Sequence, residues 1–195
     1  MQQMMIEALK VHIQKFVDIN EEDIVRISSY FKHHKIKKKQ YLLVENQLCR
    51  SNYFVVRGCL RMFFTNEKGK ENTIQFALEN WWLADYTAFS TQKASSFAIQ
   101  AIENSEVLSL DYVDHETMLE QFPQMERYFR IIHQRAHAAS QFRIKYLYDL
   151  SSEEFYHQFN KLHPEFVQRI PQYLLASFLG FTPEYLSEIR KKAIS

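Results

Sequence analysis

The stretch LLASFLGFTPEYLSEIRKK, residues 174–192, is the part of the sequence that decides the fold. Its apolar residues have the spacing of two short helices, and they are Leu175, Leu179, Phe181, Leu186 and Ile189. Ala176 is small where a bulky side chain would push these helices apart, and Gly180 follows four residues later at the turn. The pattern predicts a helix-turn-helix, and an ordinary αα corner is the alternative that spacing leaves open.

The second helix of this pair has a defined start. Thr182 offers an N-cap hydroxyl, Pro183 suits the first helical position, and Glu184 places a carboxylate in the first turn. We predict a recognition helix from Pro183 to about Ala193, in which Glu184 can accept from a cytosine amino group. In a major groove, base edges are expected to be reached by Pro183, Glu184, Ser187, Glu188 and Lys191. Phosphates are expected to be contacted by Thr182, Arg190, Lys191 and Lys192.

Charge in the C-terminal segment argues against strong non-specific binding. Residues 150–195 contain five Lys or Arg and five Asp or Glu, so the segment has no net charge. Neutralisation of phosphates supplies most of the affinity of an ordinary DNA-binding protein. We therefore expect DNA binding that is weak, dependent on a dimer, or narrowly specific.

Residues 124–149 contain neither Pro nor Gly and predict one helix about 37 Å long, at about 1.5 Å per residue. Apolar residues recur there every three or four positions: Met125, Tyr128, Phe129, Ile132, Ala136, Ala139, Phe142, Tyr146 and, just beyond, Leu150. Such a helix covers a neighbouring sheet, pairs with its twin in a homodimer, or does both. Ala136 and Ala139 favour dimerisation because small residues permit close approach.

Between residues 41 and 111 the hydrophobic period changes to two, which indicates strands. Two alternating runs flank the turn Asn66–Gly69 and predict a hairpin with Gly69 in the left-handed conformation. Further strands are predicted at Tyr53–Val56, Phe97–Ala101 and Val107–Leu110. Several short strands at this spacing indicate a small antiparallel sandwich or barrel, with a pocket expected between its walls.

Helices flank these strands. Residues 1–31 predict two helices, the second capped by Asn20. The following run HHKIKKK, residues 33–39, suits a solvated strand edge better than a nucleic-acid patch. Asp111 is expected to cap a short helix that ends at Phe122, and Ser151 and Ser152 to introduce a helix over residues 153–162.

Composition excludes several classes of protein. The 195 residues include only three glycines and no GxGxxG or GxxxxGK[ST] motif, so phosphate loops of these kinds are excluded. Two cysteines suit a reducing compartment, and no apolar run approaches the ~20 residues needed to span a bilayer. With no signal peptide at the start, we expect a cytoplasmic protein with a net charge of +1.

Catalytic and metal sites find little support. A cupin-type metal site needs histidines converging from strands, and no His-x-His lies in the predicted strands. His133 and His137 have the i, i+4 spacing of a chelating pair, but a solvated helix face is the commoner explanation. No serine lies in a nucleophile elbow. We expect no enzyme activity, no metal and no cofactor.

The order of these parts resembles the Crp/Fnr family of bacterial transcription regulators. The resemblance covers nearly the whole chain and rests on YFVVRGCLRMFF (53–64), NEKGKE (66–71), LADYTAF (83–89) and the stretch 174–192, whose form resembles Bacteroidetes-type members. It implies a homodimer that binds double-stranded DNA through the recognition helix and often a small effector in the β-roll. The iron–sulfur cysteine cluster of the oxygen-sensing branch is missing.

Departures from the family's pattern concern the effector pocket and the recognition helix. Ala84 and Asp85 occupy the Gly-Glu positions of the phosphate cassette, and Ser95 and Ser96 occupy its Arg-Ser positions. Without the arginine, cyclic AMP is not expected as the ligand, and Lys93 is only a weaker substitute. Ser140 falls where relatives close the pocket with a hydroxyl, although a helix-packing or solvent-facing role is the alternative. Glu188 stands where relatives commonly have arginine.

We therefore predict an α+β protein in three parts. Residues 1–123 form a jelly-roll-like antiparallel β-roll with flanking helices, residues 124–149 a dimerisation helix, and residues 150–195 a helix-turn-helix domain. The predicted function is a homodimeric, DNA-binding transcription regulator whose degenerate pocket binds no effector or a small molecule other than cyclic AMP. The alternative is a regulator-like protein that has lost operator binding and acts through protein–protein contacts.

Overall fold

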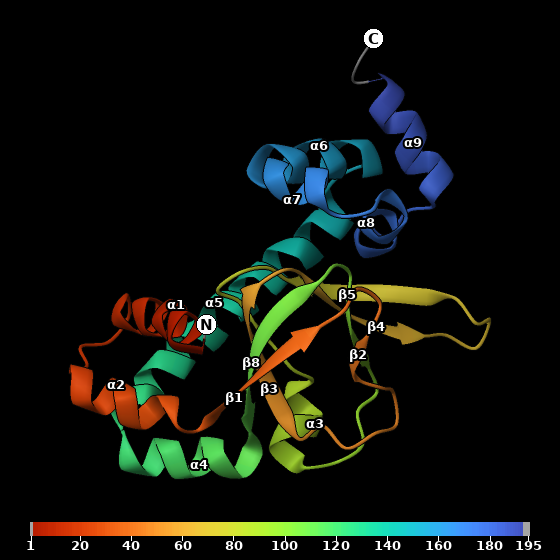
Figure 1. Cartoon of the computed structure of the whole chain (residues 1–195). Coiled ribbons are helices and arrows are strands. Elements are labelled where there is room, and N and C mark those ends of the chain that lie inside the picture. Colours follow the sequence, from red (N-terminus) through yellow and green to blue (C-terminus); the bar gives the residue numbers. More distant parts are fainter. Residues whose placement is uncertain (1, 193–195) are drawn as a thin grey trace. The chain divides into compact units, whose positions relative to one another are not determined.

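The computed structural model describes residues 2–192, with only the backbone for residues 2–5. Its contacts divide the chain into two units, residues 1–64 with 74–133 and residues 65–73 with 134–195. The helices are α1 Gln2–Gln14, α2 Glu21–Ser28, α3 Tyr86–Thr91, α4 Tyr112–Gln121, α5 Gln124–Asp149, α6 Ser152–Leu162, α7 Pro164–Arg169, α8 Gln172–Leu179 and α9 Pro183–Lys192 (Figure 1). The strands are β1 Phe31–Ile36, β2 Tyr41–Leu43, β3 Ser51–Arg57, β4 Leu60–Thr65, β5 Glu71–Ala77, β6 Trp82–Leu83, β7 Ala98–Ala101 and β8 Ser105–Asp111.

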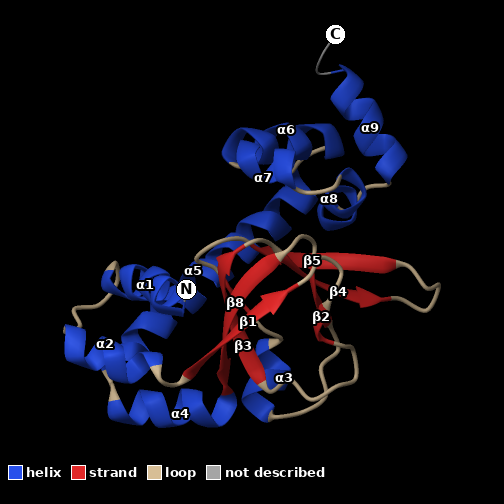
Figure 2. Cartoon of the chain, viewed as in Figure 1, coloured by secondary structure: helices blue, strands red, loops and turns tan. Residues whose placement is uncertain are grey.

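The first unit is built on a β-roll of two four-stranded sheets, shown in red in Figure 2. The strand orders are β1-β8-β3-β6 and β2-β7-β4-β5, and the strand pairs are antiparallel, including β1 with β8, β3 with β8 and β4 with β7. Apolar side chains from both sheets form one core cluster between them, and they include Val55, Leu60, Leu83, Ile99 and Val107. The predicted antiparallel roll and the α+β class are confirmed.

Helices cover the other face of the β1-β8-β3-β6 sheet. Ile13 of α1, Ile27 of α2 and Tyr128 of α5 pack with Phe54 and Leu108 in a second core cluster. α2 begins as predicted, because the Asn20 side chain accepts a hydrogen bond from Asp23 N. β1 is an edge strand and contains the first four residues of the basic run HHKIKKK, which confirms the prediction of a strand edge for residues 33–36, while residues 37–39 follow the strand in a turn.

Glycines make two turns of the roll possible. Gly69 has φ +72° in the β4–β5 hairpin, as predicted, and its N–H donates to Asn66 O at 2.8 Å. Gly58 has φ +105° between β3 and β4, and a Cβ built there would lie 2.3 Å from Ser105 Oγ. The chain therefore needs glycine at position 58 for its backbone angle and also for the space that β8 takes.

The start of α4 differs from the sequence-based expectation. Asp111 is the N-cap residue, but its side chain makes no capping hydrogen bond to the helix. Its two oxygens accept instead from Lys32 Nζ and Ser51 Oγ, each at 2.5 Å. Burial raises the pKa of Asp111, but these two hydrogen bonds, together with the nearby charges of Lys32 and His34, hold the pKa below its usual value. The carboxylate thus joins β1, β3 and β8 rather than capping α4.

The second unit packs its helices around phenylalanines. α6 begins with a capping box between Ser151 and Glu154, one residue earlier than predicted. Ring contacts of 5.1 to 6.4 Å connect aromatic residues of α6, α7, α8 and the turns beside them, among them Phe155, Phe159, Phe166, Phe178 and Phe181. Ser177 Oγ accepts from Thr73 N at 2.9 Å, which brings the hairpin tip into this unit.

Neither Cys49 nor Cys59 forms a disulfide, and both thiols are buried in the roll. Burial raises the pKa of the Cys49 thiol to about 11, which keeps it protonated and unreactive at neutral pH. Among the residues that the structure describes, no helix is both long enough and apolar enough to cross a lipid bilayer.

Candidate functional site

The helix-turn-helix is formed by α8 and α9. Leu175 and Ala176 of α8 and Leu186 of α9 are fully buried, so the small side chain of Ala176 lies inside the pair as predicted. Gly180 ends α8 with φ +82°, and the N–H of Phe181 donates back to Ala176 O at 2.8 Å. The left-handed glycine therefore produces the sharp turn between the two helices.

α9 begins where the sequence predicts. Pro183 is its first residue, and Tyr185 N donates to Thr182 Oγ1 at 3.2 Å, which confirms Thr182 as the N-cap. The last described residue of the helix is Lys192; Ala193, to which the prediction extended, lies outside the described residues.

The buried residues of α9 show which face of the helix points outward. Leu186 and Ile189 point into the unit, and the residues opposite them at helical spacing are Glu184, Ser187, Glu188 and Lys191. Glu184, Glu188 and Lys191 are exposed and Ser187 is half-buried. The structure thus brings these four predicted residues together on one face, with Thr182 and Pro183 exposed at its N-terminal end.

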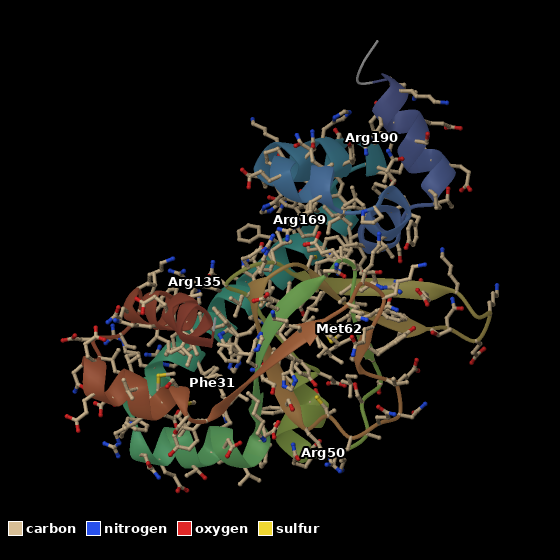
Figure 3. All side chains as sticks on the ribbon, in the orientation of Figure 1. Phe31, Arg50, Met62, Arg135, Arg169 and Arg190 are labelled. Atoms are coloured by element: carbon tan, nitrogen blue, oxygen red, sulfur yellow. The ribbon has the colours of Figure 1, made fainter. Side chains whose placement is uncertain are left out.

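Two of the predicted phosphate contacts are less available than the sequence suggests. Arg190 of α9, which is labelled in Figure 3, is half-buried. Lys192 Nζ lies 3.7 Å from Glu153 Oε2 of α6, within ion-pair distance. Both residues keep their predicted roles only if they turn toward DNA on binding.

Two exposed tyrosines were not assigned a role from the sequence. Tyr185 is 41% exposed on the flank of α9, with its ring 6.0 Å from Phe181, and Tyr173 is 58% exposed near the start of α8. Helical spacing was the signal that could have found Tyr185, because it lies one residue after Glu184 and outside the apolar positions. These rings extend the exposed surface of the helix-turn-helix.

The cassette positions of the roll also come together. Asp85 precedes α3 and is only 6% exposed, and its Oδ1 accepts from Ala88 N at 3.1 Å. Its Oδ2 accepts from Ser95 Oγ at 2.8 Å and from Ser96 N at 3.3 Å. One internal carboxylate therefore takes the donors at both ends of the segment that contains α3.

Ser95 completes this arrangement. Its hydroxyl oxygen also accepts from Phe97 N at 3.0 Å, and Ala84 is fully buried beside Asp85. Lys93 is exposed. Ser140 belongs to the second unit, where its exposed hydroxyl donates to Ala136 O at 3.0 Å within α5.

α3 packs against the first half of α5 inside the first unit. The Tyr86 ring lies 4.7 Å from the His133 ring, edge to face. Burial raises the pKa of Tyr86 to about 12, and burial together with nearby His115 lowers the pKa of His133. The cassette helix thus has a direct contact with the long helix that follows the roll.

Metal ligands do not gather in the described part of the chain. In residues 2–192, no three or more His, Cys, Asp or Glu side chains are placed so that they could hold a metal ion. The candidate functional residues are therefore those of the exposed face of α9 and, separately, those of the cassette around Asp85 and Ser95.

Comparisons with known proteins agree with this architecture. The family described as "Cyclic nucleotide-binding domain" matches residues 33–122. No curated protein sequence matches the chain.

Solved structures share the fold over most of the chain. A c-di-GMP responsive global regulator, CLP of Xanthomonas campestris, is 14% identical, with a TM-score of 0.70 over 89% of this chain and 91% of that one. FixK2 of Bradyrhizobium japonicum is 15% identical, with a TM-score of 0.69 over 83% of each chain. A protein described as a transcriptional regulator of the Crp/Fnr family from Eubacterium rectale is 13% identical, with a TM-score of 0.68 over 90% of this chain and 83% of that one. At these identities the likeness establishes the fold.

Proposed function

Because residues 33–122 match the cyclic nucleotide-binding domain and the chain has the fold of Crp/Fnr-type regulators, we propose that it is a homodimeric, DNA-binding transcription regulator. A β-roll, a long helix and a helix-turn-helix follow one another in the order expected from the sequence. The proposal places the protein in the cytoplasm and gives it no catalytic role. The suggested Bacteroidetes-type lineage stays a prediction.

The outward face of α9 carries this proposal. Glu184, Ser187, Glu188 and Lys191 lie on one side of a helix whose N-terminal residues, Thr182 and Pro183, are exposed. An α-helix presented in this way fits a DNA major groove, where carboxylates accept from cytosine and lysine reads guanine or contacts phosphate.

Selection of sequences from random duplex DNA with the purified protein tests the proposal. We expect a palindrome with half-sites about 10 base pairs apart, one helical turn. Glu184→Ala should relax the preference at one base pair of each half-site, by about 1 to 3 kcal/mol. Glu165→Ala is the matched control, because Glu165 is also an exposed first-turn carboxylate of a helix that starts with proline. No enrichment at low salt contradicts the proposal.

Dimerisation is proposed to use an exposed stripe of α5. His137, Ser140 and Ile144 are all exposed and follow one another at intervals of three and four residues, the spacing of a coiled-coil seam. Ile144→Lys should convert the dimer to monomer in sedimentation experiments, since it places a charge in that seam. Ala138→Lys, on the other side of the helix, should leave the dimer intact.

For the roll, we propose an effector other than cyclic AMP, or none. The donors near Asp85 and Ser95 are already satisfied within the protein, and the arginine that would hold a cyclic phosphate is a serine. A ligand that binds only the native state raises the melting temperature, by several degrees at about 100 times its Kd. We expect no shift with cyclic AMP or cyclic GMP; a concentration-dependent rise contradicts this part of the proposal.

The second candidate is a regulator-like protein that pairs with protein instead of DNA. The observation that favours it is the pair of exposed carboxylates, Glu184 and Glu188, on the face that would approach phosphates. Failure of the DNA selection, together with a stable dimer, is the outcome that this candidate predicts.

A further inference from the structure

Arg143, in the C-terminal half of α5, holds one residue of the helix-turn-helix in two ways. Its Nη2 donates to the backbone carbonyl of Phe178 at 2.5 Å. Its guanidinium carbon lies 4.2 Å from the centroid of the Phe178 ring, in a cation–π arrangement. The same side chain thus contacts both the backbone and the ring of a residue 35 positions further along the chain.

Phe178 lies in the last turn of α8, two residues before Gly180. The last carbonyls of a helix have no partner inside it, and the negative end of the helix dipole favours a cation there. One turn further along α5, Leu147 Cδ2 lies 3.8 Å from the place of a Cβ on Gly180. The contact of α5 with α8 therefore continues to the residue that sets the direction of α9.

The Phe178 ring belongs to the rigid core of the second unit. It lies 5.8 Å from the ring of Phe159 and 6.2 Å from that of Phe166. Burial lowers the pKa of Arg143, yet an arginine stays protonated, so its buried charge needs well-placed partners. Within the second unit, the ring contact of Tyr146 in α5 with Phe155 in α6 joins helices that are adjacent in sequence. Arg143 reaches the helix-turn-helix itself.

We propose that Arg143 is a positioning residue that fixes the helix-turn-helix against α5 and so sets the half-site spacing that the dimer accepts. The inference rests on the proposed function, in which two copies pair through α5 and each α9 reads one half-site. Simultaneous engagement of two half-sites strengthens binding only when the geometry of the two modules matches their spacing. If the contact between Arg143 and Phe178 is lost, the two helix-turn-helix modules of the dimer match the preferred spacing less well, and the dimer accepts other half-site spacings.

The test uses full-length protein and duplexes that carry the selected half-site once, or twice with the spacing changed by up to two base pairs. For the wild type we expect about a tenfold loss of affinity or more at the wrong spacing, equivalent to about 1.4 kcal/mol. For Arg143→Met we expect a penalty below about threefold, a loss of about tenfold on the best duplex, and an unchanged affinity for the single half-site. Lys145→Met is the matched control, because it removes the same charge from an exposed position of the same helix.

An Arg143→Met protein that keeps the wild-type spacing penalty overturns the inference. So does an equal loss on single and double half-sites, because that result shows damage to the helix-turn-helix itself. If Arg143→Met does not fold, Arg143→Lys, which keeps the charge without the planar fork, should show an intermediate penalty, and a wild-type penalty overturns the inference. If the wild type selects no DNA, the proposed function fails, and the inference fails with it.

Discussion

Trp82 and Tyr128 are joined in the core of the first unit: the indole Nε1–H donates to the tyrosine hydroxyl at 2.8 Å. The same hydroxyl lies 2.8 Å from His12 Nδ1. The hydroxyl oxygen therefore accepts from Trp82 and also makes a hydrogen bond with His12 Nδ1, in which the donor is set by the imidazole tautomer. One hydroxyl thus connects α1, β6 and α5.

Tyr128→Phe should destabilise the first unit. The substitution leaves Trp82 Nε1 and His12 Nδ1 buried without this partner, at about 1 to 3 kcal/mol for each orphaned group. Urea unfolding measures the loss. Tyr148→Phe is the control. Tyr148 is 90% exposed, so this substitution should change the free energy of unfolding by less than about 0.5 kcal/mol. Equal effects of the two substitutions would contradict the buried network.

Gly58→Ala should be far more damaging than Gly69→Ala. At Gly58 the new Cβ meets the Ser105 backbone Cα at 2.7 Å as well as its side chain, so the strained φ adds to a clash, and we expect a loss of about 3 kcal/mol or more. At Gly69 no described atom outside its two chain neighbours lies within 4 Å of the new Cβ, which leaves only the left-handed strain of about 1 to 2 kcal/mol. The free energies of unfolding of the two variants provide the comparison, and the reverse order is the contrary result.

Glu188→Arg should raise DNA affinity and steepen its salt dependence. One added phosphate contact increases the slope of log K against log salt by about 0.9. Binding isotherms across a salt series measure this slope. Glu120→Arg makes the same charge change on an exposed part of α4, and a similar gain in that variant would show an effect of net charge rather than of the α9 face.

His133 should make stability depend on pH. Its pKa is lowered in the folded protein by burial and by His115, so the unfolded chain, with a pKa of about 6.5, takes up the proton first. Stability is therefore complete above about pH 6.5 and is lost as the pH falls from there toward the lowered pKa. His133→Gln should reduce the difference between unfolding free energies at pH 5.5 and 7.5. His137→Gln, one helical turn further along α5, removes the same imidazole and should leave that difference as it is.

Local patterns in the sequence predicted the helix caps, the long helix and the hairpin, whereas α3, β2 and β6 were not predicted separately. Asn20, Ser151 and Thr182 cap helices as predicted, because an N-cap hydrogen bond joins residues only two or three positions apart. The absence of Pro and Gly over residues 124–149 gave the bounds of α5. Period-two alternation and Gly69 gave the hairpin.

Side-chain partners across the fold were not predictable in this way. Asp111 was expected to cap α4, but strand pairing brings Lys32 and Ser51 to its carboxylate, and neither is near it in sequence. The cassette positions were found by resemblance, whereas the bonds of Asp85 to Ser95 and Ser96 depend on how the intervening loop closes. Arg143 carried no sequence signal, because its partner Phe178 is brought to it by the packing of α8.

The two thiols allow opening of the first unit to be followed by chemical labelling. Cys49 and Cys59 are the only cysteines of the sequence, and both are buried inside the roll. A thiol reagent can therefore modify the protein only when the roll opens, while residues 134–195 can unfold without any signal. The rate of labelling would time the opening of the roll alone, so a substitution in the helix-turn-helix could be assigned to its own unit without a separate probe.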